Sequence, residues 1–188
     1  MAKNSLLFFA WADYVMLSKS LNLLFFPGVI LHELSHVFAC ALLGVGVREI
    51  KFFGTREAYV LHDSGPAYKI LLITLMPLIL GNLLAFGIIH SINFYNLNLE
   101  TFFFAWLAFS FMFFSFPSKQ DIDNSLNTLF GLYHSKVFGH SGILDKIVYA
   151  ISFPFVALPL SLALIPLMLF EYVFILRIAW AAVMFFGI

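Results

Sequence analysis

The stretch LHELSHVFA, Leu31 to Ala39, contains the pattern HExxH. On a helix, residues four apart lie on the same face, so the imidazoles of His32 and His36 can reach one metal ion. Zinc binds neutral imidazole nitrogen, and catalytic zinc sites keep one position open for water. Glu33 lies beside the first histidine, where its carboxylate can accept a proton from that water. The pattern therefore predicts a zinc site on a helix, with Glu33 as the catalytic base.

Apolar residues surround this motif on both sides. Pro27 suits the first turn of a helix, and Gly44 is typical of a helix end, so we expect one helix from Pro27 to Leu43. Polar and charged side chains are costly inside such an apolar helix, which makes a functional role for them the first hypothesis. Cys40 lies about 12 Å along the helix from His32, too far to share an ion with both histidines. We expect Cys40 to be a small buried residue.

The composition predicts an integral membrane protein. Of 188 residues, 62% are hydrophobic and 11% are charged, and phenylalanine alone occurs 25 times. A soluble domain of this size cannot bury that much apolar surface. Ten acidic and ten basic residues give no net charge, so the chain lacks the basic surface of a nucleic-acid-binding protein. A single cysteine excludes an intrachain disulfide framework. We expect one membrane-embedded domain over residues 1–188.

We expect an all-α polytopic membrane protein with about five to six hydrophobic helices and one small β-hairpin. The charged segment Val47 to Asp63 contains strand-forming residues around a glycine and predicts the hairpin, which is either a connector or an exposed strand edge that receives a peptide. Asn124 to His140 predicts a short helix and a loop at the surface. The other hydrophobic helices are expected at Tyr68 to His90, Thr101 to Phe116, Lys146 to Phe170 and Glu171 to Ile188.

The N-terminal apolar segment allows two interpretations. Ser5 to Phe26 forms either one helix or a short interfacial helix followed by a reentrant segment. The apolar run from Leu6 to Ala10 is shorter than the hydrophobic region of a signal peptide, so we expect the segment to be retained.

Positive charge predicts the orientation in the membrane. Lysine and arginine are concentrated in the hairpin and in the segment after Pro117, whereas the loop Ser91 to Leu99 has neither. Loops rich in these residues remain in the cytoplasm, so the hairpin and the segment that contains Asp121 are expected on the cytoplasmic side. The two histidines and Asp121 then approach the same membrane face.

A third metal ligand is required, because two histidines alone make a poor catalytic zinc site. Asp121 is the best-placed candidate, and Asp123 is its rival. The alternative for this pair is a helix N-cap and a first-turn acid, which needs no metal. Other acids and histidines are placed less well, and the histidines among them are expected at the surface: Glu49, Glu57, Glu100, Glu171, His62, His90, His134 and His140.

One polar residue lies within the second long apolar helix. Asn82 is expected at membrane depth, where its amide either forms hydrogen bonds with another helix or faces the metal.

From Pro27 to Asn124 the chain resembles the site-2 protease family of intramembrane zinc metalloproteases. The resemblance rests on HExxH in an apolar helix, a following hairpin, a helix with Pro77 and Asn82, and a later aspartate. It implies that His32, His36 and Asp121 hold one zinc ion, that Glu33 is the base, and that Asn82 supports the substrate or transition state. It also implies regulated cleavage of membrane proteins at a transmembrane helix, in the cell membrane of a prokaryote.

Two features depart from the pattern of that family. The later motif usually reads Leu-Asp-Gly, whereas this chain has Gln120-Asp121-Ile122, and Met76 stands where a glycine is expected before Pro77. The first departure leaves Asp123 open as the third ligand, and together they indicate a divergent branch. We also expect no PDZ-type module within residues 1–188.

Two other functions stay open. A degenerate relative could bind metal without proteolysis, as a sensor or chaperone, but such a site does not need the base Glu33. A metal transporter would distribute polar ligands along several helices, whereas here they concentrate at one level of the membrane.

Overall fold

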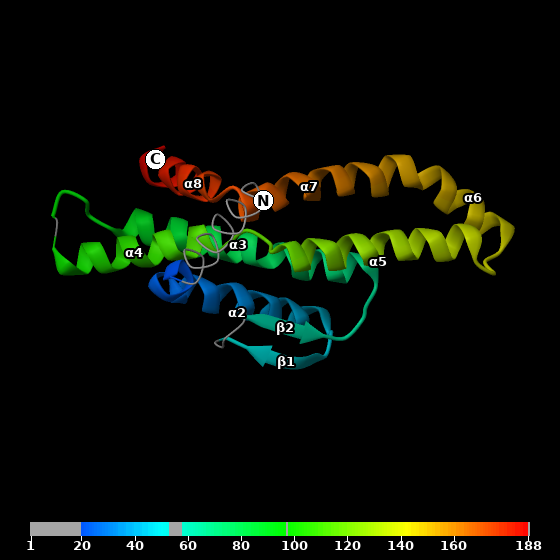
Figure 1. Cartoon of the computed structure of the whole chain (residues 1–188), viewed down its shortest axis with the longest axis horizontal. Helices are drawn as coiled ribbons and strands as arrows, with labels where there is room; N and C mark the ends of the chain where they lie inside the picture. Colours follow the sequence, from blue (N-terminus) through cyan, green and yellow to red (C-terminus); the bar gives the residue numbers. More distant parts are fainter. Residues whose placement is uncertain (1–19, 53–57, 97, 188) are drawn as a thin grey trace, which may run out of the picture.

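The computed structural model describes residues 20–52, 58–96 and 98–187, and most of them are helical (Figure 1). The strands are β1 (Val47–Lys51) and β2 (Tyr59–His62), and a π-helical segment, η1 (Phe153–Ala157), joins α6 to α7. The helices are α2 (Phe26–Leu43), α3 (Ala67–Ser91), α4 (Leu99–Phe113), α5 (Lys119–Phe138), α6 (Ile143–Ser152), α7 (Leu158–Tyr172) and α8 (Phe174–Phe186).

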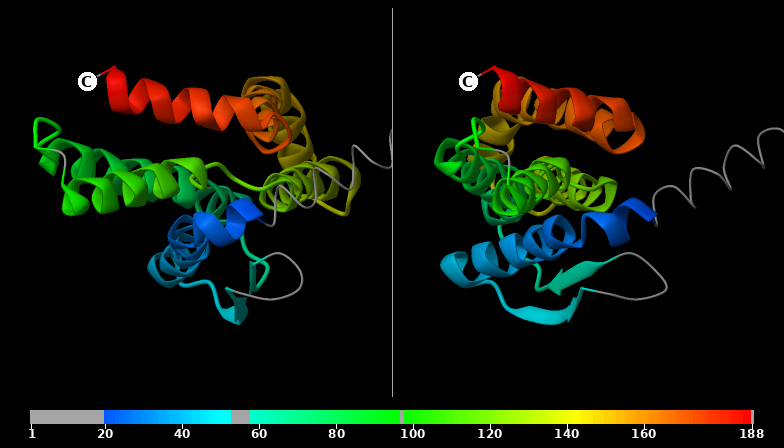
Figure 2. Two further views of the ribbon diagram at one scale, coloured as in Figure 1. Left: turned by 60° about the vertical axis from the view of Figure 1, so that its left-hand side comes forward. Right: turned by 90° about the vertical axis from the view of Figure 1, so that its left-hand side faces the viewer.

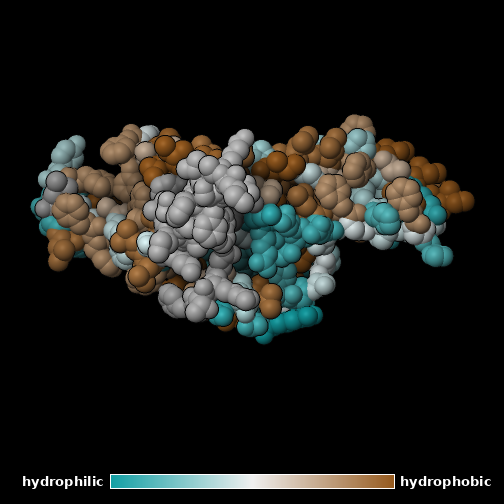
Figure 3. All heavy atoms as spheres, viewed as in Figure 1, coloured by the Kyte–Doolittle hydropathy of each residue, from teal (hydrophilic) through white to brown (hydrophobic). Residues whose placement is uncertain are grey.

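These elements form three layers (Figures 1 and 2). Helix α2 and the hairpin form one outer layer, α3, α4 and α5 form the middle layer, and α6, α7 and α8 form the other outer layer. On the face shown in Figure 3, hydrophilic surface gathers around the hairpin. Segments far apart in the sequence therefore meet where α2 lies against the middle layer.

Three stretches of helix are long and apolar enough to cross a membrane: Phe26–Leu43, Ala67–Ser91 and Ile143–Phe170. Two further apolar helices, Leu99–Phe113 and Ile175–Phe186, are shorter. The sequence predicted about five to six hydrophobic helices. The structure confirms a largely helical chain with a small hairpin, in which three helical stretches reach the length of a membrane span.

Helix α2 has the bounds that its sequence predicts. It begins at Phe26 with Pro27 in its first turn, and it ends before Gly44, whose φ of 65° is left-handed. The Gly44 cap satisfies carbonyls of the last turn, as glycine commonly does at this position. Residues 20–24 are also helical, and the backbone at Phe25 interrupts the helix before α2. Most of the segment from Ser5 to Phe26 lies outside the described residues, so its two interpretations stay open.

The predicted hairpin is confirmed. Strands β1 and β2 pair antiparallel, with Ile50 opposite Val60 and an irregularity between Val47 and Glu49. An Arg48–Asp63 ion pair ties the base of the hairpin together, and Lys69 donates a hydrogen bond of 2.6 Å to the Leu43 carbonyl at the end of α2. The Lys69 bond thereby joins the start of α3 to the end of α2, on either side of the hairpin.

The helices around Pro117 differ from the prediction. Helix α4 ends at Phe113, because Pro117 has no N–H to donate to the Phe113 carbonyl. A helix followed by a loop does occupy Asn124 to His140, but the helix is longer than predicted, since α5 is one helix of 20 residues that begins at Lys119. Ser118 and Asp121 form a capping box, which satisfies free N–H groups of the first turn and starts the helix early.

Close helix contacts hold the layers together. The Gly28 N–H donates a 2.7 Å hydrogen bond to Ser110 Oγ, which in turn donates to the Phe25 carbonyl at 2.8 Å. A Cβ atom at position 28 would lie 2.1 Å from the Ser110 carbonyl oxygen, so only glycine allows α2 to approach α4 this closely. Gly81 of α3 meets Ser115 in the same way, with 2.8 Å between an added Cβ and the Ser115 Cβ. These contacts fix the positions of α2 and α3 beside the end of α4.

Candidate metal centre

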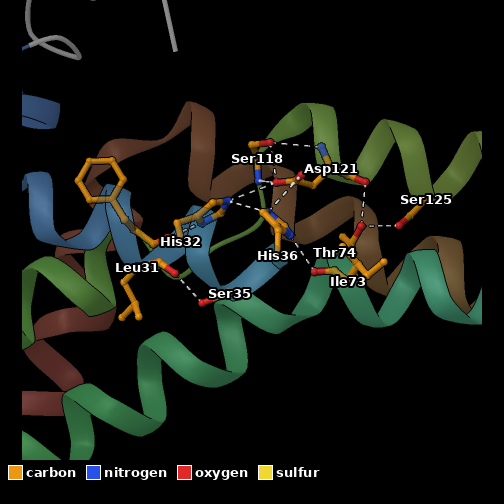
Figure 4. A network of polar contacts seen from close by, with 10 residues as sticks. Leu31, His32, Ser35, His36, Ile73, Thr74, Ser118, Asp121 and Ser125 are labelled. Carbon is orange, nitrogen blue, oxygen red and sulfur yellow. Dashed lines mark hydrogen bonds and ion pairs between the residues drawn. The ribbon is translucent and has the colours of Figure 1, made fainter. Parts of the chain in front are cut away.

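Helix α2 turns both motif histidines toward the middle layer (Figure 4). His32 and His36 are buried, their rings lie edge to face, and their Nε2 atoms are 3.2 Å apart. Glu33, the next residue after His32, is also buried. The opposite face of the helix carries exposed apolar residues, Leu34 and Phe38 among them. The helical spacing therefore brings both imidazoles to one point inside the protein.

Main-chain carbonyls fix the orientation of both imidazole rings. His32 Nδ1 lies 2.8 Å from the Phe114 carbonyl oxygen, and His36 Nδ1 lies 2.9 Å from the Ile73 carbonyl oxygen. A carbonyl can only accept a hydrogen bond, so each Nδ1 carries the proton and donates it. In the neutral ring, each Nε2 then presents a lone pair. This is the arrangement that metal-binding histidines adopt in proteins.

Asp121 completes a group of three acceptors. Its Oδ2 atom lies 3.4 Å from His32 Nε2, and its Oδ1 atom lies 3.4 Å from His36 Nε2. Burial alone would raise the pKa of the Asp121 carboxyl, but when no metal is bound and the imidazoles also carry a proton on Nε2, the charge of His36 and hydrogen bonds from both rings hold that pKa well below its usual range. The carboxylate is therefore ionised at neutral pH.

Asp121 also caps α5. Its Oδ2 atom accepts hydrogen bonds from the Ser118 N–H at 2.9 Å and from Ser118 Oγ at 2.7 Å. The sequence presented a cap and a metal ligand as alternatives for this residue. In the structure the Asp121 carboxylate caps the helix with one oxygen, while both oxygens face the imidazoles, so the two roles are compatible.

A buried pair of hydroxyl groups anchors the start of α5 on α3. Thr74 Oγ1 donates to the Asp121 carbonyl at 3.1 Å and lies 2.6 Å from Ser125 Oγ (Figure 4). Thr74 is the neighbour of Ile73, whose carbonyl holds His36. One turn of α3 thus contacts both elements that carry the candidate ligands.

The distances between these groups fit a metal ion. Two ligands bound tetrahedrally to zinc at 2.0–2.1 Å lie about 3.3 Å apart. The observed separations of 3.2 and 3.4 Å match this value, although each imidazole faces a different oxygen of Asp121. One ligand atom from each of His32, His36 and Asp121 lies within 4.8 Å of the others. Two imidazoles and a carboxylate are a donor set that suits zinc, and a cation satisfies three acceptors that face one another.

Glu33 is the second acid near this group. Its carboxylate interacts electrostatically with His32, His36 and Asp121. Within the described part of the chain, no hydrogen bond is recorded for the Glu33 side chain. The Glu33 carboxylate is therefore near the candidate metal position without being tied to another protein group.

The rival acids and histidines are placed elsewhere. Asp123 is half-buried and does not belong to the group formed by His32, His36 and Asp121. The Glu49 carboxylate accepts a hydrogen bond from Tyr59, and Glu100 lies in the first turn of α4. Glu57 and the Glu171 side chain lie outside the described part of the structure. The described histidines outside the motif also lie outside this group: His62, His90, His134 and His140.

Asn82 connects α3 to α8 and to the segment after α4. Its Nδ2 donates to Ser115 Oγ at 3.0 Å and to the Leu78 carbonyl at 2.7 Å, and its Oδ1 accepts from Trp180 Nε1 at 2.8 Å. Of the two roles that the sequence left open, the structure shows the hydrogen bond to other helices. A role for Asn82 in supporting the substrate or transition state stays a prediction, and it would require these bonds to open.

Cys40 is fully buried, as predicted. It packs with Ala39, Val45, Ile70 and Ile73 between α2 and α3.

Sequence reasoning missed the groups that hold the ligands. The Phe114 and Ile73 carbonyls are main-chain atoms, and nothing in their side chains identifies them. Ser118 could have been found, because Ser118-Lys119-Gln120-Asp121 has the spacing of a capping box. Thr74 and Ser125 gave no signal in the sequence, since their contact depends on how α3 packs against α5.

Comparison with protein-family models finds no match, and neither the curated proteins nor the solved structures contain a match.

Proposed function

We propose that this protein is a zinc metalloprotease of the membrane that hydrolyses peptide bonds in or near transmembrane segments of other membrane proteins. One observation carries the proposal: two imidazole nitrogens from a helix long and apolar enough to cross a membrane meet the carboxylate of Asp121 on α5 at 3.2–3.4 Å, with the buried Glu33 beside them. The resemblance to the site-2 protease family supports the same reading. His32, His36 and Asp121 would hold the zinc ion.

When bound, zinc would polarise the substrate carbonyl and make a water molecule more acidic. The residues of the chain supply the proton transfers. Glu33 accepts a proton from the attacking water as the water oxygen bonds to the carbonyl carbon. The bond between that carbon and the amide nitrogen then breaks, and Glu33 returns the proton to the leaving amine. Burial of Glu33 and of both histidines restricts bulk water at the reacting atoms.

The substrate must be unwound before this reaction. In a transmembrane helix, the peptide carbonyls are occupied by internal hydrogen bonds. The hairpin offers exposed strands, β1 in particular, whose edges could bind an extended segment through main-chain hydrogen bonds. The hairpin follows α2 directly, so a segment held there would lie close to the helix that carries the motif.

Zinc content and zinc-dependent cleavage test the proposal. The protein, purified in detergent after expression with added zinc, should contain one zinc ion per chain by elemental analysis. Removal of zinc with a chelator should abolish cleavage of a model membrane protein with one transmembrane segment, and added zinc should restore it.

A double variant, His32→Ala with His36→Ala, serves as the metal-free control. Zinc bound equally well by this double variant would place the ion elsewhere. A zinc-loaded protein that leaves a panel of transmembrane substrates intact would support metal binding without proteolysis.

The proposal also predicts an orientation in the membrane. A metal site shared by α2 and α5 needs the hairpin, which follows α2, and α5 on the same side of the membrane. We expect the hairpin and the α5–α6 connection in the cytoplasm, with Asn96 on the other side, since lysine and arginine are concentrated in the hairpin and in the segment after Pro117. The loop that contains Asn96 lies at the opposite end of the molecule from the α5–α6 connection (Figure 1).

Cysteines introduced at Arg56, Ser135 and Asn96 in a Cys40→Ser background report the orientation. A reagent that cannot cross membranes should label only position 96 in intact cells. Labelling of positions 56 and 135 from opposite sides would rule out this arrangement.

A further inference from the structure

Helix α3 contains a proline four residues after the carbonyl that holds His36. In a regular α-helix, each carbonyl accepts a hydrogen bond from the N–H group four residues later. Position 77 is proline, which has no N–H, so the Ile73 carbonyl lacks its helical donor. The ring of a proline inside a helix also pushes against the carbonyl four residues earlier, which tilts that carbonyl away from the helix axis.

The freed carbonyl is the one that His36 uses. His36 Nδ1 lies 2.9 Å from the Ile73 oxygen, and both residues are buried between α2 and α3. With Nδ1 donating to Ile73, the ring can present only Nε2 to Asp121. A donor on residue 77 would compete for the same oxygen and would turn it back along the helix axis.

The second histidine has a similar arrangement. The Phe114 carbonyl accepts from His32 Nδ1, and its helical donor would be the N–H of Ser118. That N–H donates instead to Asp121 Oδ2 at 2.9 Å. Each imidazole thus binds a carbonyl whose helical donor is absent or diverted.

We propose that Pro77 is a positioning residue for the metal centre, which keeps the Ile73 carbonyl open for His36 and so directs His36 Nε2 toward Asp121. This role rests on the proposed zinc site, but it does not depend on proteolysis. Pro77 is fully buried, and it acts through the Ile73 carbonyl rather than through contact with a substrate.

The substitution Pro77→Ala tests the proposal, because it adds an N–H and improves the helix at once. Zinc affinity should fall about 10- to 100-fold, the usual effect of losing a group that orients a metal ligand. The melting temperature of the zinc-free protein should stay the same or rise, because alanine is much better than proline inside a helix. Nitrogen NMR of histidine-labelled, zinc-free protein should show His36 protonated at Nδ1 in the wild type and a mixture of tautomers in the variant.

Pro166→Ala in α7 is the matched control, since it makes the same change inside another helix. It should leave zinc affinity unchanged. Unchanged zinc affinity in Pro77→Ala would overturn the proposal, and so would a loss of zinc affinity together with a lower melting temperature, which would assign Pro77 to packing. A wild-type protein that binds no zinc would overturn the proposed function as well, whereas a zinc-binding protein without protease activity would leave the role of Pro77 intact.

Discussion

Glu33→Gln should retain one zinc ion per chain and lower peptide hydrolysis by about 10²- to 10⁴-fold. Glutamine has nearly the same shape as glutamate, but its amide cannot take the proton from the attacking water. The histidines and Asp121 remain in place, so the metal content should not change. Within the described residues no hydrogen bond to the Glu33 side chain is recorded, so the substitution breaks no known contact.

The measurement compares cleavage of a transmembrane reporter by equal amounts of zinc-loaded wild type and variant. Glu100→Gln is the control for replacing an acid by an amide, because Glu100 lies in the first turn of α4 and outside the metal centre. It should cleave at the wild-type rate. Cleavage by Glu33→Gln at a comparable rate would remove Glu33 from the mechanism.

Asp121→Ala should reduce zinc affinity by more than about 100-fold, because a direct ligand contributes more than the groups around it. Activity should fall with zinc occupancy. The variant also loses the acceptor for the Ser118 N–H, which can then compete with His32 for the Phe114 carbonyl. Asp123→Ala, two residues later, should leave both zinc affinity and activity largely intact.

Asp121→Asn separates the cap from the ligand. An asparagine oxygen can still accept the hydrogen bond from the Ser118 N–H, so the start of α5 should persist, but the negative charge that favours a cation is lost. Zinc affinity measured by competition with a chelator, together with helix content by circular dichroism, distinguishes the two effects. The reverse pattern, with Asp123→Ala losing zinc and Asp121→Ala keeping it, would make Asp123 the ligand.

The sequence predicts the parts of this fold that depend on local residues. The bounds of α2 follow from Pro27 and Gly44, and the hairpin follows from the change in composition after Gly46. The extent of α5 was missed because the segment after Pro117 is polar. The capping box formed by Ser118 and Asp121 indicates that a helix begins there although the segment is polar.

The candidate site could be predicted only as far as side chains identify it. The spacing of His32 and His36 places two nitrogens on one face of a helix, whatever the remainder of the fold. The choice between Asp121 and Asp123 depends on how α5 begins and on how Thr74 anchors it to α3. Such contacts between distant segments arise from packing, so the local sequence does not reveal them.

The two carbonyls that hold the imidazoles have a consequence for how this protein can vary. A side-chain substitution at Ile73 or Phe114 changes packing, but it leaves the carbonyl oxygen in the backbone. An alanine scan would therefore find the ligands and overlook the atoms that orient them. We therefore expect substitutions at these two positions to preserve the orientation of the imidazoles as long as the path of the backbone is unchanged. Pro77, which interrupts the hydrogen bonding of α3, would be the side chain that identifies the arrangement in a sequence.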